Sequence, residues 1–388
     1  MTRFVLASVI TFALVAAPAI AQQPAADGPY KVLKSARVGG EGGTDYIFAD
    51  VVGRRLYIPH GAVRATPATD AAAERPAVPA RITVFNLDNL DPIGEILTAP
   101  NSQGNGAAID PKSGHGFTSS RPAITMFDTK SLKLLKSIPI DSGVVPDGIL
   151  FDGFNDRVYV FSHPTKDATV IDSRDGTVLG RIDLGGVPEQ GVSDGKGLLY
   201  VVMQDAAGSV TVVDVKTMKA IAHYPLGDKG GCNGLALDVK NKVLFAACAR
   251  SGVTATTPAP PPGPPQPAVP MMVVLSATDG KILANLPLAG GSDGAAFNPA
   301  TMEAFSTHGN GTLTVVKEKS PTSFEVEQNL TTMNGARTIA FDDKTGHIFA
   351  MSVERGPVPP PQPGAPPGGR GPQAPAIPGS FTILMIGK

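Results

Sequence analysis

One pattern occurs seven times along the chain, and this repeat restricts the possible folds more than any other feature. Each copy starts at a polar residue after a small turn and contains four short apolar runs separated by turn residues. The seven starting residues are Asp45, Asn105, Asp147, Glu189, Asn233, Asp293 and Arg337. Most of them are about 42 residues apart, which is typical of a β-propeller with one four-stranded blade per repeat. The sequence therefore predicts an all-β fold, a seven-bladed β-propeller.

The last repeat and the first residues before the repeats complement each other. The third apolar run of each copy is β-branched, as at residues 210–213, and favours a buried strand. The seventh copy reaches only its third run, residues 381–387, whereas an unmatched strand-like run, residues 30–38, precedes the first copy. Pairing of these two runs would leave no open sheet edge. We therefore expect the N-terminal strand to close the last blade.

The first residues have the features of a secretory signal peptide. Arg3 precedes an apolar stretch, residues 4–17, and a small-residue cleavage site ends at Ala21. No later apolar run is long enough for a membrane span. We expect a periplasmic or secreted monomer. The expected organisation is a signal peptide at 1–21, a flexible segment at 22–29 and the propeller at 30–388.

Three segments rich in Pro, Ala and Gly interrupt the repeat, and we expect them to be flexible or polyproline-like. They are residues 62–80, 252–269 and 355–379. Each falls between the second and third strands of its blade, in blades 1, 5 and 7, so all three should emerge on one face. They are either surface-loop insertions that the fold tolerates or a partial lid over the channel mouth.

The start of each first strand should line the central channel of a propeller. The ligand-binding candidates are therefore the seven starting residues, Asp45, Asn105, Asp147, Glu189, Asn233, Asp293 and Arg337. We call them the polar ring. Its alternative role is to satisfy backbone groups and water in a wet channel.

Blades 6, 7 and 1 are expected to add two histidines to the polar ring. His308 and His60 end second strands, so we expect them in one sector with Arg337. These three residues are the candidate catalytic residues: a histidine beside carboxylates can move a proton, and an arginine can bind an anionic group. Carboxylates with histidine can also hold a divalent metal, although no specific metal ligand is predicted.

Cys232 and Cys248 are the only cysteines. Cys232 is expected to begin a first strand and Cys248 to end the adjacent antiparallel strand, on the same face. In an oxidising compartment this placement favours a disulfide. A metal pair or a reactive thiol are the alternatives.

Charge and motifs exclude several classes of function. The net charge of -1 argues against strong binding of nucleic acid. No Cys-x-x-Cys-His motif for covalent haem occurs, nor a phosphate loop or an HExxH zinc motif. The cofactor, if any, stays unknown.

Several phrases identify a family resemblance. RLYIPHG at 55–61, VPDG at 145–148, GART at 335–338 and the x-T-V-x-D strands resemble the YncE-like, YVTN-repeat family of periplasmic seven-bladed propellers. That resemblance implies the fold but no single reaction. The leading expectation is a non-enzymatic binding or scaffold protein with an unknown small-molecule or protein ligand. The alternative is a lactonase-like hydrolase that uses acidic and histidine residues at the channel mouth, with or without a divalent metal.

Overall fold

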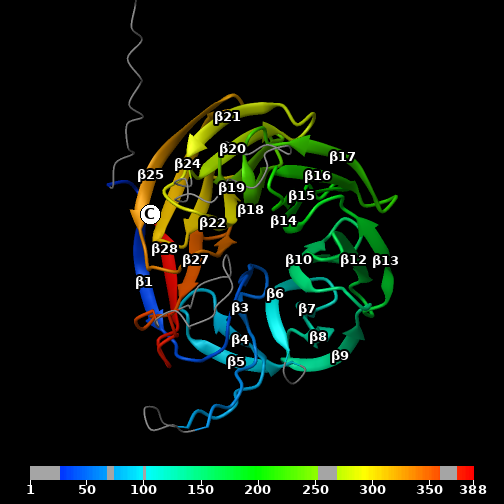
Figure 1. The fold of residues 1–388 in the computed structure, drawn as a ribbon, viewed down its shortest axis with the longest axis vertical. Helices are drawn as coiled ribbons and strands as arrows, with labels where there is room; N and C mark the ends of the chain where they lie inside the picture. The colour runs from blue at the N-terminus through cyan, green and yellow to red at the C-terminus, as the bar shows by residue number, and fades with distance from the viewer. Residues whose placement is uncertain (1–26, 68–73, 99–101, 252–268, 359–373) are drawn as a thin grey trace, which may run out of the picture.

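Seven four-stranded antiparallel sheets surround a common axis in the computed structural model (Figure 1). The predicted seven-bladed β-propeller is confirmed. The structure describes residues 27–67, 74–98, 102–251, 269–358 and 374–388. The expected signal peptide and the middle of each Pro-rich insertion lie outside these ranges. No helix in the described residues is long and apolar enough to cross a membrane.

Within each blade the strands follow one another from the channel outward, except in the last blade. Blades 1 and 2 contain β2 (Phe48–Asp50), β3 (Arg55–His60), β4 (Arg81–Asn86), β5 (Pro92–Leu97), β6 (Gln103–Asp110), β7 (His115–Arg121), β8 (Ala123–Asp128) and β9 (Lys133–Pro139). Blades 3 and 4 contain β10 (Pro146–Asp152), β11 (Arg157–Ser162), β12 (Asp167–Asp172), β13 (Val178–Asp183), β14 (Pro188–Ser193), β15 (Leu198–Met203), β16 (Ser209–Asp214) and β17 (Lys219–Pro225). Blades 5 and 6 contain β18 (Gly230–Asp238), β19 (Val243–Arg250), β20 (Met271–Ser276), β21 (Ile282–Pro287), β22 (Ser292–Asn298), β23 (Glu303–His308), β24 (Thr312–Ser320) and β25 (Ser323–Thr331). Blade 7 contains β26 (Ile339–Asp342), β27 (His347–Ser352), β28 (Thr382–Gly387) and, outermost, β1 (Lys31–Arg37).

The apolar core lies between neighbouring blades, where the middle strands face each other. Val170 of β12 and Val212 of β16 are buried, as the β-branched third runs predict. Turns after these strands are held by the Asp that ends each strand. Asp172 Oδ1, for example, accepts the backbone N–H of Arg174 at 2.9 Å. These aspartates therefore stabilise turns.

The N-terminal strand closes the ring, as predicted. β1 pairs antiparallel with β28, from Lys31 opposite Gly387 to Arg37 opposite Thr382. In Figure 1 the first strand, in blue, lies beside the last strand, in red. Just before β1, the backbone of Tyr30 exchanges two hydrogen bonds with the side-chain amide of Gln328 in β25. The closing strand is thus tied to blade 6 as well as to blade 7.

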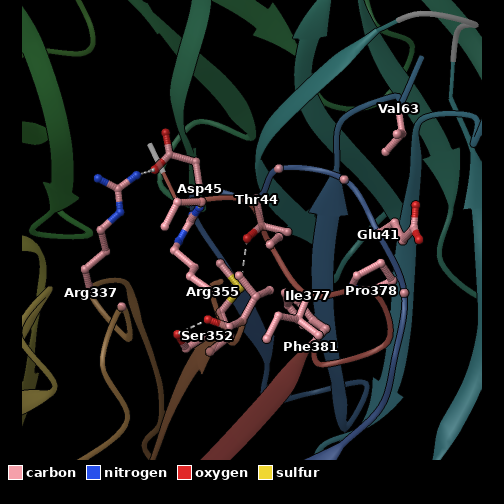
Figure 2. Close-up of a pocket in the computed structure, with 18 of the residues that line it drawn as sticks. Glu41, Thr44, Asp45, Val63, Arg337, Ser352, Arg355, Ile377, Pro378 and Phe381 are labelled. Carbon is pink, nitrogen blue, oxygen red and sulfur yellow. Dashed lines mark hydrogen bonds and ion pairs between the residues drawn. The ribbon is translucent and has the colours of Figure 1, made fainter. Parts of the chain in front are cut away.

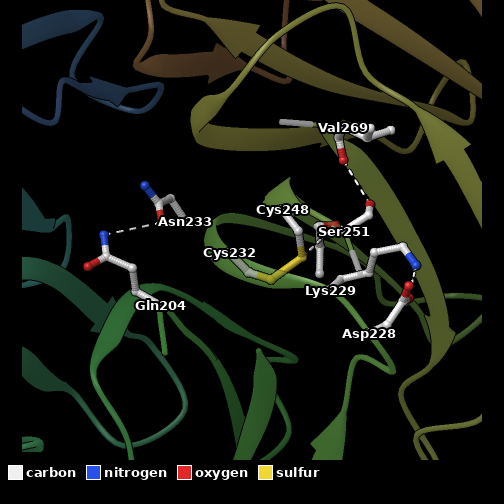
Figure 3. The surroundings of a disulfide bond; sticks show 9 residues. Gln204, Asp228, Lys229, Cys232, Asn233, Cys248, Ser251 and Val269 are labelled. Atoms are coloured by element: carbon white, nitrogen blue, oxygen red, sulfur yellow. Dashed lines mark hydrogen bonds and ion pairs between the residues drawn. A yellow bond between two sulfur atoms is a disulfide. The ribbon is translucent and has the colours of Figure 1, made fainter. Parts of the chain in front are cut away.

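The predicted disulfide is present. Cys232 in β18 and Cys248 in β19 are directly opposite each other in the sheet, and their sulfurs are bonded (Figure 3). Both residues are fully buried. Because they are only 16 positions apart in the sequence, the expected stabilisation through loss of chain entropy in the unfolded state is about 3 kcal/mol. The bond fastens the two inner strands of blade 5 to each other.

The bases of two insertions are hairpin-like, which differs from the expected polyproline character. In blade 1, isolated bridges join Val63 to Val78 and Thr66 to Arg75. In blade 7, one bridge joins Arg355 to Ala376. Backbone hydrogen bonds near 2.8 Å across these pairs explain the difference, because the insertions continue the antiparallel pairing of the strands they connect.

Candidate functional site

All seven residues of the polar ring line one cavity at the mouth of the central channel. This channel-mouth cavity has a volume of about 820 Å³. Each ring residue lies in the first strand of its blade or shortly before it, so the seven blades each contribute one polar side chain. The prediction that these residues gather at one place is therefore matched by the geometry, whereas their role in ligand binding stays a prediction.

A local irregularity in the inner strands aims the ring side chains at the channel. In blade 3 the pairing register shifts between Pro146 and Ile149, on either side of Asp147. Such a bulge re-aims a side chain. The next residue, Gly148, is as important, because a Cβ there would lie 2.9 Å from the carbonyl oxygen of Glu189 in blade 4. Glycine thus allows the inner strands of neighbouring blades to approach closely enough to bring their ring residues together.

Hydrogen bonds connect the ring from blade 4 to blade 6. The side-chain amide of Gln204 donates to Glu189 Oε1 and to Asn233 Oδ1, the latter at 3.2 Å (Figure 3). Asn233 Nδ2 in turn donates to Asp293 Oδ1 at 2.8 Å. The orientation of each amide is set by its two neighbours, so this part of the cavity wall is preorganised.

His163 lies between two buried carboxylates on the wall formed by blades 3 and 4. Its Nε2 is 2.8 Å from Asp147 Oδ2 and 3.3 Å from Glu189 Oε1. Close contact with the carboxylates of Asp147 and, next, Glu189 raises the pKa of His163 to about 10. The imidazole is therefore a cation at neutral pH. Across the channel, the hydroxyl of Tyr46 donates to Glu189 Oε2 at 2.5 Å.

These three side chains form the group best suited to a metal ion among the described residues. One ligand atom from each of Asp147, His163 and Glu189 lies within 4.8 Å of the others. We call this group the carboxylate–histidine triad. Its carboxylates belong to the predicted ring, but its histidine does not.

Arg337 and Asp45 form the opposite wall. Arg337 contacts Asp293 Oδ2 at 2.5 Å and Asp45 Oδ1 at 3.6 Å, and Figure 2 shows its guanidinium directed at Asp45. Burial and repulsion by Asp147 raise the pKa of Asp45 to about 7, although Arg337 partly offsets both effects. Asp45 therefore exchanges a proton near neutral pH. A carboxyl group with such a pKa in a cavity is a physical sign of a functional site.

The two histidines proposed as proton carriers are not at the channel mouth. His60 and His308 are buried inside their blades, and neither lines the channel-mouth cavity. Each Nε2 lies 2.9 Å from a threonine hydroxyl of the neighbouring strand, Thr83 and Thr314 respectively. Burial lowers the pKa of His60 to about 3 and that of His308 to about 4. Both are neutral at physiological pH, and the histidine at the mouth is His163.

The sequence prediction chose histidines at the last position of a second strand, but the histidine that lines the cavity is one position later, and this difference has a simple cause. Successive side chains of a strand point to opposite faces. His60 and His308 end their strands and point into the blade, whereas His163 and Gln204 each follow the last residue of a second strand and line the cavity. The signal that identifies His163 in the sequence is therefore the position after the strand end.

Burial of neutral His308 predicts a specific pH dependence of stability. Below pH 6.5 the unfolded chain binds a proton that the folded protein excludes down to about pH 4, so stability falls as the pH falls through this window. His308→Gln is expected to be less stable than wild type at pH 7.5. The difference in free energy of unfolding between wild type and variant should shrink by about 1.4 kcal/mol per pH unit below 6.5. Urea unfolding at a series of pH values measures it.

A second non-titrating substitution controls this experiment. His308→Leu removes the proton site but keeps an apolar side chain, so its difference from wild type should shrink with the same slope. A constant difference for both variants from pH 7.5 to 4.5 would contradict the assignment of His308 as a buried neutral imidazole.

Comparison with known proteins identifies the fold alone. No protein-family model matches the chain, and no curated protein matches it. Among solved structures, hydrazine synthase from Kuenenia stuttgartiensis is similar with a TM-score of 0.62 and 13% identity, over 79% of this chain and 91% of that chain. A chain of the mitotic checkpoint complex is similar with a TM-score of 0.63 and 10% identity, over 89% of this chain and 95% of that chain. At these identities the likeness supports a β-propeller scaffold and no activity.

Proposed function

We propose that this protein is a ligand-binding propeller whose channel mouth binds a divalent cation at the carboxylate–histidine triad. The observation that carries the proposal is the convergence of Asp147, His163 and Glu189, with ligand atoms within 4.8 Å of one another. Two carboxylate oxygens and one imidazole nitrogen suit Zn²⁺ or Mn²⁺. The ion would leave coordination positions open toward the cavity, where a small ligand can bind.

Metal binding would replace a proton at this site. A metal ligates only the neutral form of histidine, whereas His163 is protonated between its two carboxylates because its pKa is about 10. Binding at pH 7.5 should therefore release about one proton per ion. The affinity should rise about tenfold per pH unit, since the fraction of neutral imidazole rises by this factor below its pKa.

Calorimetric titration of the protein with Zn²⁺ and with Mn²⁺ tests this prediction. Measurements at pH 7.5 in two buffers of different ionisation enthalpy give the number of protons released. Glu189→Gln is expected to weaken binding at least about tenfold. Asp293→Asn is the matched control, because it makes the same change in the ring outside the triad and should bind as wild type does.

Two outcomes would overturn the metal proposal. One is that neither ion binds the wild-type protein. The other is that Asp293→Asn weakens binding as much as Glu189→Gln, because the ion would then respond to the general negative charge of the ring. Circular dichroism of both variants verifies that each is folded.

A hydrolase is the second candidate, and the state of Asp45 favours it. A carboxyl group with a pKa of about 7 can act as a general base near neutral pH, and a divalent metal can supply an activated water. The protein should then hydrolyse lactones in the presence of the ion found by calorimetry, and Asp45→Asn should lose this activity while it still binds the ion. A lactone screen without turnover would leave binding as the function.

The location of the protein outside the cytoplasm belongs to the same proposal. We place the protein in the periplasm or outside the cell, in keeping with its leader-like residues 1–21 and its disulfide. The ligand-binding role and the resemblance to YncE-like, YVTN-repeat propellers are part of this proposal too. A natural N-terminus at Gln22 in protein purified from the periplasm would support the proposed location.

A further inference from the structure

We infer that a second cavity, between the bases of the blade 1 and blade 7 insertions, binds a small organic anion with an apolar body. This stem cavity has a volume of about 860 Å³, a size that suits one small molecule. It adjoins the channel mouth, and the charged residues Asp45, Arg64 and Arg337 line both cavities (Figure 2). Its other walls are separate from the carboxylate–histidine triad, so the inference does not depend on the proposed metal.

The wall contributed by blade 1 is held in place by several contacts. The guanidinium of Arg75 binds Glu41 Oε2 with two hydrogen bonds, at 2.8 and 3.1 Å. Glu41 lies in the loop between β1 and β2, and its carbonyl also accepts a hydrogen bond from Arg81. The backbone pairing of Val63 with Val78 completes this base. The wall is therefore a preformed part of the cavity.

The wall contributed by blade 7 is held in a similar way. The backbone N–H of Ile377 donates to the carbonyl oxygen of Glu354 at 2.8 Å, next to the bridge between Arg355 and Ala376. The hydroxyl of Ser380 donates to Ile377 O at 2.6 Å. These bonds fix the direction in which Ile377 faces the cavity.

Apolar side chains line the stem cavity and are accessible from it. Val358 and Ile377 are 63% and 40% exposed, which is unusual for large aliphatic residues. Both line the cavity, together with Val63. Its floor is formed by Met351 and Phe381, which belong to the core. This surface can bury the apolar body of a ligand.

Positive charge distinguishes this cavity from the channel mouth. Its lining includes four arginines, Arg64, Arg75, Arg337 and Arg355, and two carboxylates, Glu41 and Asp45. Glu41 neutralises Arg75, and Asp45 contacts Arg337. In the described part of the chain neither Arg64 nor Arg355 forms an ion pair. Two guanidinium groups beside an apolar wall complement a carboxylate or sulfonate on an apolar body.

Two fluorescent probes of nearly the same shape test the inference. 8-Anilinonaphthalene-1-sulfonate is an apolar anion, and N-phenyl-1-naphthylamine has the same aromatic body without the charge. Both are titrated into the full-length protein in EDTA, so that no metal contributes. We expect the anion to bind at least about tenfold more tightly than the neutral probe. Decanoate should displace the anion, and decanol should not.

Substitutions then locate the binding site. Arg355→Gln should weaken binding of the anion about fivefold to tenfold and leave binding of the neutral probe unchanged. Ile377→Ser should weaken binding of both probes, because it removes part of the apolar wall. Arg174→Gln is the matched control, since this exposed arginine lies outside the cavity and should leave binding of both probes unchanged. Thermal unfolding verifies that each variant is folded, because this anion also binds partly unfolded chains.

The inference is overturned if the two probes bind equally, or if Arg355→Gln and Arg174→Gln bind the anion alike. Either result would show that the cavity does not select an anion. Because metal is absent throughout, these results are independent of the outcome of the calorimetric titration.

Discussion

Deletion of residues 380–388 is expected to abolish the cooperative fold. The deletion removes β28, which lies between β27 and β1, so two sheet edges open and β1 loses its only partner strand. Five buried apolar side chains are lost with it: Phe381, Ile383, Leu384, Met385 and Ile386. At about 2 kcal/mol each, their burial contributes about 10 kcal/mol, as much as the whole stability of a typical domain. Circular dichroism and calorimetric unfolding measure the effect.

Two further measurements make this prediction precise. Ile383→Ala, a single change within β28, should cost about 2–5 kcal/mol, whereas Ala at the exposed Lys31 of β1 should cost little. A synthetic peptide of residues 380–388 added to the truncated protein should restore part of the transition by strand addition. A truncated protein that melts at the wild-type temperature would show that the ring does not need this closure.

Replacement of Arg54 by Met is expected to destabilise the protein by about 3 kcal/mol. Arg54 lies between β2 and β3 of blade 1, and its guanidinium binds both carboxylate oxygens of Asp342 in blade 7, at 3.0 and 2.7 Å. Asp342 is fully buried. Burial raises the pKa of Asp342, but hydrogen bonds from Arg54 and Thr345 outweigh this effect and hold it below its ordinary value. Arg54→Met leaves a buried charge without its main partner.

Asp88→Asn is the matched control for this prediction. Asp88 binds the same guanidinium but is largely exposed, so its substitution should cost less than about 1 kcal/mol. The double variant Arg54→Met/Asp342→Asn should lose less free energy of unfolding than the single variants Arg54→Met and Asp342→Asn lose in sum. The reason is that the buried charge is removed together with its partner. Additive losses in urea unfolding would argue against a direct coupling between blades 1 and 7.

Much of the fold follows from local pattern alone. Each blade is a short antiparallel meander, so its strands depend on turns and β-branched runs that are close together in the sequence. This locality is the reason why all seven third strands are predicted where the structure has them. The closure by residues 30–38 follows instead from the count of strand runs, because the last copy lacks a fourth run and one unmatched run precedes the first copy. The polar ring is predictable for the same reason, because the strand starts of all blades are equivalent by symmetry. The disulfide follows from strand pairing, since Cys232 and Cys248 are opposite each other in adjacent strands.

The chemistry of the site depends on details that a repeat pattern does not contain. A side chain one position further along a strand faces the opposite side, so His163 reaches the cavity whereas His60 and His308 enter the blades. The pKa values of His163 and Asp45 arise from charges brought together from different blades, and the stem cavity arises from two insertions nearly 300 residues apart in the sequence. By itself the sequence determined the propeller, its closure and the ring positions, since these follow from the repeat and from the number of strand runs in it. Only the tertiary structure decided which side chains meet, because burial and electrostatic interaction act over distances in space.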